Sequence, residues 1–339
     1  MIQSGDISAE SLDWISESIG LSNEEILSKG QKLRIESSQR TFFRIPFKDK
    51  SSILMVVPQG IDESIESFCT KAEIFKKANV NVPVIYFKND LLGNLIVEDF
   101  GDDVLQFYLN EKNSNKLIKL AIEQIHKIEV IKLDESIFSD FEKITENNLY
   151  LFKKFFLEEF LEVPELKNLK EEIDEFYSII ISELKDHPKV INHYDFESRN
   201  LISLSEKKIG VIDFQDALIG PLGIDLASIF KDLYKKWKKE EIVDWLDFYV
   251  ENSQIVKTAS LKTAEVKRMV DIASLQRQTR ILGKLSQVFL ELKRSERLKD
   301  FKTILKYLMT TSLEYDETKR YSEFFKNLIP ILNQRLKTL

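Results

Sequence analysis

Three side chains that could manage a metal ion and a phosphate follow one another in the middle of the sequence. Asp195 stands in the segment HYDFESRN, and Asn200 comes five residues later. Asp213 opens an Asp-Phe pair thirteen residues after Asn200. Phosphoryl transfer from a nucleotide needs a metal held against the phosphates and a carboxylate aimed at the attacking hydroxyl. We therefore expect Asp195 to accept the hydroxyl proton, and Asn200 and Asp213 to offer oxygen ligands to Mg²⁺.

Short strands must surround these residues if the three groups are to converge. Apolar runs predict strands at 190–191, 201–204 and 208–212, and a turn at 205–206 joins the last two into a hairpin. The His-x-Asp-x-x-x-x-Asn segment, the hairpin-length gap and the apolar-Asp-Phe ending together match the catalytic and metal-binding segments of kinases. The alternative is a set of ordinary turn residues at strand ends. We favour the kinase interpretation because three roles and two spacings coincide.

A longer stretch of the chain resembles a known family. HYDFESRNLI followed by IGVIDFQDALIGPLGIDLASIF is similar to the aminoglycoside phosphotransferase superfamily. Within it, DFQDA, GP and DLAS resemble the bacterial kinases that phosphorylate N-acetylmuramate and N-acetylglucosamine at the anomeric hydroxyl. The resemblance implies a small-molecule kinase that uses ATP and Mg²⁺. It also implies that Asp225 is a buried aspartate supporting the catalytic loop, with His193 as a second support.

The resemblance covers most of the chain and implies an α+β, bilobal protein-kinase-like fold. A small N-lobe, residues 1–98, would contain a mixed sheet and a helix that bind the nucleotide. A larger, mainly helical C-lobe, residues 99–339, would carry the catalytic hairpins and the substrate-binding helices. The composition agrees, since only 10 Gly and 7 Pro in 339 residues indicate long elements, mostly helices.

The first predicted hairpin, 31–47, would cover the phosphates of the nucleotide. Its turn lacks the glycines usual in kinases, so groups near Ser38 would have to meet the phosphate oxygens. The third strand, 52–57, also lacks the lysine that kinases use to hold the α- and β-phosphates. We expect Arg40 or Arg44, or a lysine just before the strand, to substitute for it.

A helix predicted over 62–78 would be the regulatory-type helix of the N-lobe. Its Glu66 or Glu73 could pair with the cation that holds the phosphates, or could belong to a solvated acidic face. After the next hairpin, the segment EDFG matches a hinge between the lobes, with adenine bound by main-chain groups at Glu98 and Phe100.

Four polar residues are candidates for contact with the acceptor. Two lie near the catalytic motifs, and two lie in the segment SLQRQTRILG, which again resembles the anomeric sugar kinases. The candidates are Arg199, Gln215, Gln276 and Arg277. For the last two, the alternative is ordinary polarity on the surface of a helix. Glu197 departs from the expected pattern, because a basic or polar residue is expected there.

The overall composition excludes several other classes of protein. A net charge of −7 and a pI of about 5.4 argue against a dedicated nucleic-acid partner. Three histidines and the single Cys69 provide no zinc-type cluster and no internal disulfide, and fit a reducing cytoplasm. The first residues do not resemble a signal peptide, and no apolar run approaches membrane-spanning length. We expect a cytoplasmic monomer with a sugar or amino-sugar substrate and no membrane partner.

The main hypothesis is transfer of the γ-phosphoryl group of ATP to the anomeric hydroxyl of N-acetylmuramate or N-acetylglucosamine. One alternative acceptor is an aminoglycoside or a choline-like amino alcohol, although a cationic acceptor needs an acidic pocket that the sequence does not show. Another alternative is a catalytically inactive pseudokinase that only binds nucleotide. The missing strand lysine and the missing glycines motivate that alternative.

Overall fold

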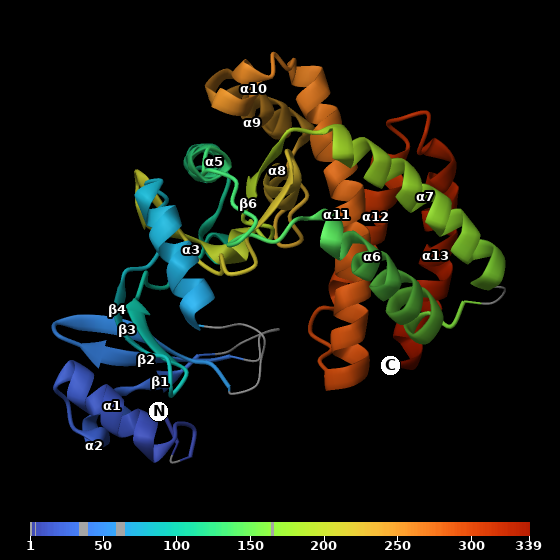
Figure 1. Cartoon of the computed structure of the whole chain (residues 1–339). Coiled ribbons are helices and arrows are strands. Elements are labelled where there is room, and N and C mark those ends of the chain that lie inside the picture. The colour runs from blue at the N-terminus through green and yellow to red at the C-terminus, as the bar shows by residue number, and fades with distance from the viewer. Residues whose placement is uncertain (1, 4, 34–39, 59–64, 164–165) are drawn as a thin grey trace.

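The computed structural model describes residues 2–3, 5–33, 40–58, 65–163 and 166–339. A sheet with two N-terminal helices forms a small part of the molecule, and helices form most of the larger part (Figure 1). The last strand of the sheet, β5, ends at Glu98. No helix in the described ranges combines the length and the apolar character needed to cross a membrane.

Within the described residues, five antiparallel strands form the sheet, in the order β1-β2-β3-β5-β4. Their bounds are β1 (Gln31–Lys32), β2 (Thr41–Phe47), β3 (Lys50–Val56), β4 (Ile85–Asn89) and β5 (Asn94–Glu98). Strand residues alternate between two cores, since side chains point to opposite faces in turn. Leu54 and Ile96 belong to one core, while Met55 and Leu95 belong to the other.

The first core packs against α1 (Ala9–Ile19) and α2 (Asn23–Lys29) through Ile15 and Ile26, which are fully buried. The second core lies under α3 (Ile65–Lys77). Both predicted acidic partners on α3, Glu66 and Glu73, are exposed, so the solvated-face alternative holds for them. Another part of α3, around Ala72, belongs to the core of the larger lobe. The helix therefore bridges the two parts of the molecule, and Figure 1 shows it between the sheet and the helical part.

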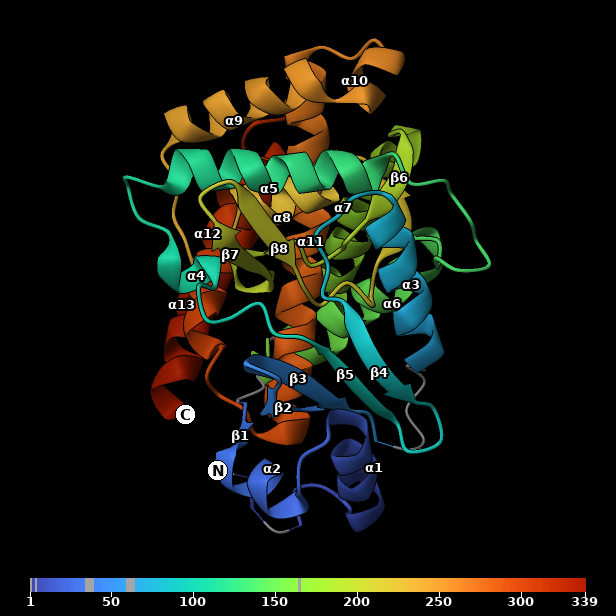
Figure 2. The same ribbon diagram turned by 90° about the vertical axis from the view of Figure 1, so that its left-hand side faces the viewer.

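Helices make up most of the larger lobe, and α11 runs through its middle (Figure 2). In chain order they are α4 (Leu105–Tyr108), α5 (Ser114–Glu129), α6 (Glu142–Leu151), the π-helix η1 (Phe152–Phe160), α7 (Leu166–Asp186), α8 (Ile224–Phe230), α9 (Lys239–Asn252), α10 (Gln254–Thr258), α11 (Thr263–Leu292), α12 (Phe301–Ser312) and α13 (Lys319–Thr338). Short 3₁₀ turns, η2 (Ser198–Asn200) and η3 (Leu298–Asp300), complete the set.

The long helix α11 is continuous through Gly283. A Cβ atom at Gly283 would lie 2.6 Å from the backbone nitrogen of Phe152. Glycine is therefore required here for close packing of α11 against η1. Three phenylalanines of η1, Phe152, Phe156 and Phe160, are fully buried in the core of this lobe.

Two small antiparallel pairs lie within the helical lobe. β6 (Lys189–Asn192) pairs with β9 (Leu218–Pro221), and β7 (Leu201–Ser205) pairs with β8 (Lys208–Val211). The predicted strands at 190–191, 201–204 and 208–212 are thereby confirmed to within one or two residues. Figure 2 shows the β7–β8 pair beneath α5, on the same side of the lobe as α4. These strands flank the segments that carry Asp195, Asn200 and Asp213.

Candidate active site

The loop that carries Asp195 begins directly after β6 and is held at its start by Asp225. The carboxylate of Asp225 accepts hydrogen bonds from the backbone N–H of His193 (2.7 Å) and of Tyr194 (2.9 Å). Tyr194 has a φ of 79°, a backbone conformation that a non-glycine residue keeps only when its surroundings stabilise it. Burial raises the pKa of Asp225 to about 6, even though both hydrogen bonds favour the charged carboxylate.

A second buried carboxylate holds the far end of the same loop. Asp232 accepts from the backbone N–H of Ser198 (2.9 Å) and of Tyr234 (2.7 Å), and it is fully buried. Burial raises the pKa of Asp232 to about 6 as well. The sequence analysis missed this residue. The available signal was its position seven residues after Asp225, two residues beyond the end of the short helix α8.

The β7–β8 pair brings the predicted metal ligands together. The backbone N–H of Ile212 donates to the carbonyl oxygen of Asn200 (3.0 Å), which places Asn200 beside Asp213. The side-chain amide of Asn200 donates to the carbonyl oxygen of Asp195 (2.9 Å). His193 Nε2 donates to the carbonyl oxygen of Ile212 (2.9 Å) and so ties the catalytic loop to the same strand. The predicted residues therefore form one connected group.

The donor set at this point suits Mg²⁺. Since the Asn200 amide nitrogen bonds to the catalytic loop, its oxygen is the atom left to meet a ligand. Asp213 has a φ of 64°, and its Oδ1 accepts from Gln215 Nε2 (2.6 Å). No group of three or more acidic, histidine or cysteine side chains in the described part of the chain could hold a metal on its own. Two oxygen donors fit a magnesium ion that takes its other ligands from nucleotide phosphates and water.

Arginines from two elements surround the carboxylate of Asp195. Arg280 of α11 pairs with it at 2.6 Å between Nη2 and Oδ1, and the Arg280 guanidinium lies 4.0 Å from the ring centre of Tyr194. Burial alone raises the pKa of Asp195, but the charges of Arg280, Arg199 and Arg277 outweigh it and hold this pKa well below its usual range. Asp195 is therefore ionised at neutral pH. Arg280 was missed, although it lies three residues after Arg277 on the same helix.

The unexpected Glu197 is a buried counter-ion. Its Oε1 lies 3.1 Å from Nη2 of Arg277 and 3.5 Å from Nη2 of Arg199. Gln276 and Arg277 are each 1% exposed, so surface polarity, the alternative interpretation for these two residues, is wrong. The guanidinium nitrogens of Arg277 have no hydrogen-bond partner of good geometry in the described structure, so its contact with Glu197 is ionic.

The predicted nucleotide-binding residues are divided between the hinge and the first hairpin. Arg44 pairs with the hinge carboxylates of Asp99 (2.6 Å) and Asp102 (2.8 Å). We therefore reassign Arg44 from phosphate neutralisation to the hinge. Arg40 is buried, and Ser38 lies outside the described residues.

Both predicted adenine contacts lie at the end of β5. The backbone N–H of Glu98 donates to the carbonyl oxygen of Val84 (2.8 Å), so this N–H is already engaged. The ring of Phe100 packs on β8, because a Cβ atom at Gly210 would lie 2.5 Å from it. The hinge is therefore anchored on the hairpin that carries Asp213.

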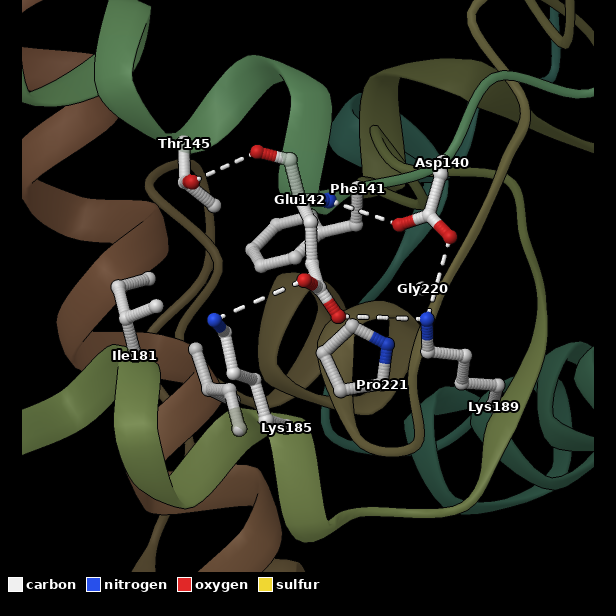
Figure 3. Close-up of a pocket in the computed structure, with 10 residues that line it drawn as sticks. Asp140, Phe141, Glu142, Thr145, Ile181, Lys185, Lys189, Gly220 and Pro221 are labelled. Carbon is white, nitrogen blue, oxygen red and sulfur yellow. Dashed lines mark hydrogen bonds and ion pairs between the residues drawn. The ribbon is translucent and has the colours of Figure 1, made fainter.

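A small pocket elsewhere in the lobe does not belong to this site. It lies between α6, α7 and β9 and is lined by charged side chains that pair with one another (Figure 3). Lys189 lies 3.1 Å from Asp140 and 3.3 Å from Glu142, and Lys185 lies 3.6 Å from Glu142. None of the predicted site residues lines this pocket.

Solved structures of similar fold include kinases of small molecules. An ADP-bound aminoglycoside phosphotransferase superposes with a TM-score of 0.60 at 17% identity, over 90% of this chain and 98% of that one. Choline kinase LicA from Streptococcus pneumoniae gives 0.60 at 15% identity, over 89% of this chain and 100% of that one. At such identities the likeness concerns the fold, and it confirms the predicted protein-kinase-like architecture.

Sequence comparison gives the family. N-acetylmuramate/N-acetylglucosamine kinase of Pseudomonas putida is 25% identical over 254 residues, which cover 75% of this chain and 74% of that protein. The protein of the same name from Neisseria meningitidis is 26% identical over 286 residues, covering 82% and 84%. The profile of the phosphotransferase enzyme family matches residues 29–257, more than half of the chain and the whole catalytic segment. The chain therefore belongs to the phosphotransferase enzyme family.

Proposed function

We propose that this enzyme transfers the γ-phosphoryl group of ATP, with Mg²⁺, to a sugar hydroxyl, and that the acceptor is the anomeric hydroxyl of N-acetylmuramate or N-acetylglucosamine. The observation that carries the proposal is the connected group of Asp195, Asn200 and Asp213, held together by hydrogen bonds between the catalytic loop and the β7–β8 pair. The names of the curated relatives support the choice of acceptor.

In this mechanism Asp195 orients the acceptor hydroxyl toward the γ-phosphoryl group. Its carboxylate is a weak base, since the neighbouring arginines hold its pKa below the usual range. A weak base suffices, because phosphoryl transfer proceeds through a loose transition state in which the hydroxyl loses its proton late. Orientation is therefore its first role, and proton acceptance follows as the new O–P bond forms.

Asn200 and Asp213 would hold the magnesium ion, which neutralises charge on the phosphate oxygens. Arg40 and the segment at Ser38 remain our candidates for phosphate contact, and main-chain groups near Glu98 and Phe100 remain our candidates for adenine.

The acceptor side of the proposed site is cationic next to Asp195. Arg280 already occupies one oxygen of that carboxylate, so a cationic acceptor such as an aminoglycoside or choline would approach a like charge. This favours a neutral or acidic sugar. Arg199, Gln215, Gln276 and Arg277 remain our candidates for acceptor recognition, with Gln215 placed by its bond to Asp213.

A panel of acceptors tests the proposal. The full-length protein is incubated with ATP labelled at the γ-phosphate and with N-acetylglucosamine, N-acetylmuramate, kanamycin or choline. We expect label only in the two amino sugars, in a product that releases phosphate in mild acid, as an anomeric phosphate does. Transfer to kanamycin or choline alone would refute the acceptor assignment. Nucleotide binding that ignores Mg²⁺, with no transfer to any acceptor, would favour the inactive alternative.

A further inference from the structure

Helix α3 carries a buried lysine that the mechanism above does not use. Lys71 is 7% exposed. Its ammonium donates to the main-chain carbonyl oxygens of Gln215 and of Ala217, the second at 3.1 Å. It also lies 5.8 Å from the ring centre of Phe138. A buried ammonium is stable only where it is paired or hydrogen-bonded, and the two carbonyl contacts help to stabilise the charge at this position.

The two carbonyl groups belong to the segment that directly follows the proposed metal ligand Asp213. Gln215, whose carbonyl meets Lys71, also donates its side-chain amide to Asp213. Phe214 between them contacts the rings of two α3 residues, Phe68 at 4.8 Å and Phe75 at 5.5 Å between centroids. One helix therefore contacts both the backbone and the ring of this segment.

The conformation of this segment needs such support. Asp213 has a φ of 64°, a backbone conformation that is unfavourable for a non-glycine residue and that persists only where neighbouring contacts stabilise it. Ring contacts are weakly directional, whereas the bonds from Lys71 fix where the carbonyl groups of residues 215 and 217 point. The carbonyl directions in turn set the path of the chain away from Asp213.

We propose that Lys71 is a positioning residue, which fixes the segment 213–217 on α3 so that Asp213 faces the metal-bound nucleotide. The inference rests on the proposed function. It also offers a reason why this chain can dispense with a lysine in the middle of β3. Kinases commonly hold the corresponding helix through an ion pair between that lysine and a glutamate of the helix. In this chain, Lys71 instead bonds α3 to the segment 213–217, which belongs to the larger lobe and not to the sheet.

Three variants test the proposal in the full-length protein: Lys71→Met, Lys71→Arg and, as a matched control, Lys76→Met at an exposed position of the same helix. Hydrogen–deuterium exchange is measured first, without metal or nucleotide. We expect faster exchange in Lys71→Met at amides 213–219, with α11 unchanged, a smaller effect in Lys71→Arg, and none in Lys76→Met. The arginine variant keeps the charge and the donors, so it also serves if the methionine variant does not fold.

Binding of Mn²⁺ with ATP, followed by electron paramagnetic resonance, is the second measurement. We expect Lys71→Met to weaken Mn²⁺ binding by about 10-fold, the lower end for loss of an outer contact to a metal site. Unchanged exchange and unchanged Mn²⁺ affinity in a folded Lys71→Met protein would overturn the inference. Faster exchange spread evenly over the chain in both Lys71 variants would also overturn it, since that indicates a role in overall stability only.

Neither measurement uses an acceptor, so an error in the proposed acceptor leaves this test intact. Failure of the wild-type protein to bind Mn²⁺ with ATP would refute the proposed function. The exchange data would still decide whether Lys71 holds segment 213–217.

Discussion

Two arginine–carboxylate pairs in this molecule have the same shortest distance, 2.6 Å, and different surroundings. At the hinge, Asp99 accepts from Arg44 with both oxygens, from Ser51 (2.6 Å) and from the backbone N–H of Gly101 (2.9 Å). At the candidate active site, Arg280 meets only Oδ1 of Asp195.

The difference teaches how the two carboxylates are used. The hinge carboxylate has its hydrogen-bonding capacity filled, which is what a structural link between β2, β3 and the hinge requires. Oδ2 of Asp195 accepts no side-chain hydrogen bond from the described residues, so it can meet an acceptor hydroxyl. A carboxylate held on one side and open on the other suits orientation of a substrate.

The largest expected effect comes from neutralising the open carboxylate. Asp195→Asn should lower turnover by ~10²–10⁴-fold, the usual range for a positioned general base. Asp99→Asn is the matched control, and it should leave turnover within a few-fold of wild type. Steady-state kinetics with saturating ATP and acceptor compares the two. Equal losses in both variants would break the distinction between the two pairs.

The Arg280→Met variant tests the same difference between the two pairs through the pH dependence of activity. Because burial raises the pKa of Asp195 and Arg280 is the strongest opposing charge, removing Arg280 should raise that pKa. The active form of Asp195 is the ionised carboxylate. As the pH is lowered, the variant should therefore lose activity at a pH about one unit or more above that of the wild-type protein. Turnover at neutral pH should fall by about 10-fold, since the carboxylate also loses its fixed orientation. Loss of activity at the same acidic pH as in the wild-type protein would contradict this role of Arg280.

The Asp232→Asn variant tests whether Asp232 stabilises the far end of the loop that carries Asp195. The free energy of unfolding is the quantity measured. The pKa of Asp232 is raised to about 6, so the folded state binds more protons than the unfolded state between about pH 4 and 6. This group therefore lowers the free energy of unfolding as pH rises through that window. The asparagine variant has no such pH-dependent contribution. The loss in its free energy of unfolding relative to wild type should therefore be larger near pH 4.5 than near pH 7. Urea unfolding at both pH values gives the difference, which a pH-independent deficit would contradict.

The smallest effect on catalysis is expected at the hinge arginine. Arg44→Met should change turnover by less than about 3-fold, yet lower the free energy of unfolding by roughly 1–3 kcal/mol, because it leaves the buried carboxylate of Asp99 without its charged donor. Urea unfolding and steady-state kinetics measure both quantities. A large loss of ATP binding with unchanged stability would return Arg44 to the phosphate site that the sequence first suggested.

Short-range patterns allowed much of this protein to be predicted. The strands around Asn200 and Asp213 follow from apolar runs separated by a turn, and a hairpin of that length forces its two ends together. The capping box of Ser22 and Glu25 has an equally local cause, since its two partners lie three residues apart. In each case the physical cause acts within a few residues, so the sequence alone determined the outcome.

Tertiary structure alone decided the partners of the charged groups around the candidate active site and the hinge. Lys71 meets the carbonyl of Ala217, 146 residues away in the chain, and Arg280 meets Asp195 across 85 residues. Spacing carries no information on such pairs, because they depend on how α3 and α11 pack against the catalytic hairpins. The same packing made Glu197 a buried counter-ion and turned Arg44 toward the hinge, since a long charged side chain pairs with whichever opposite charge the fold brings within its reach.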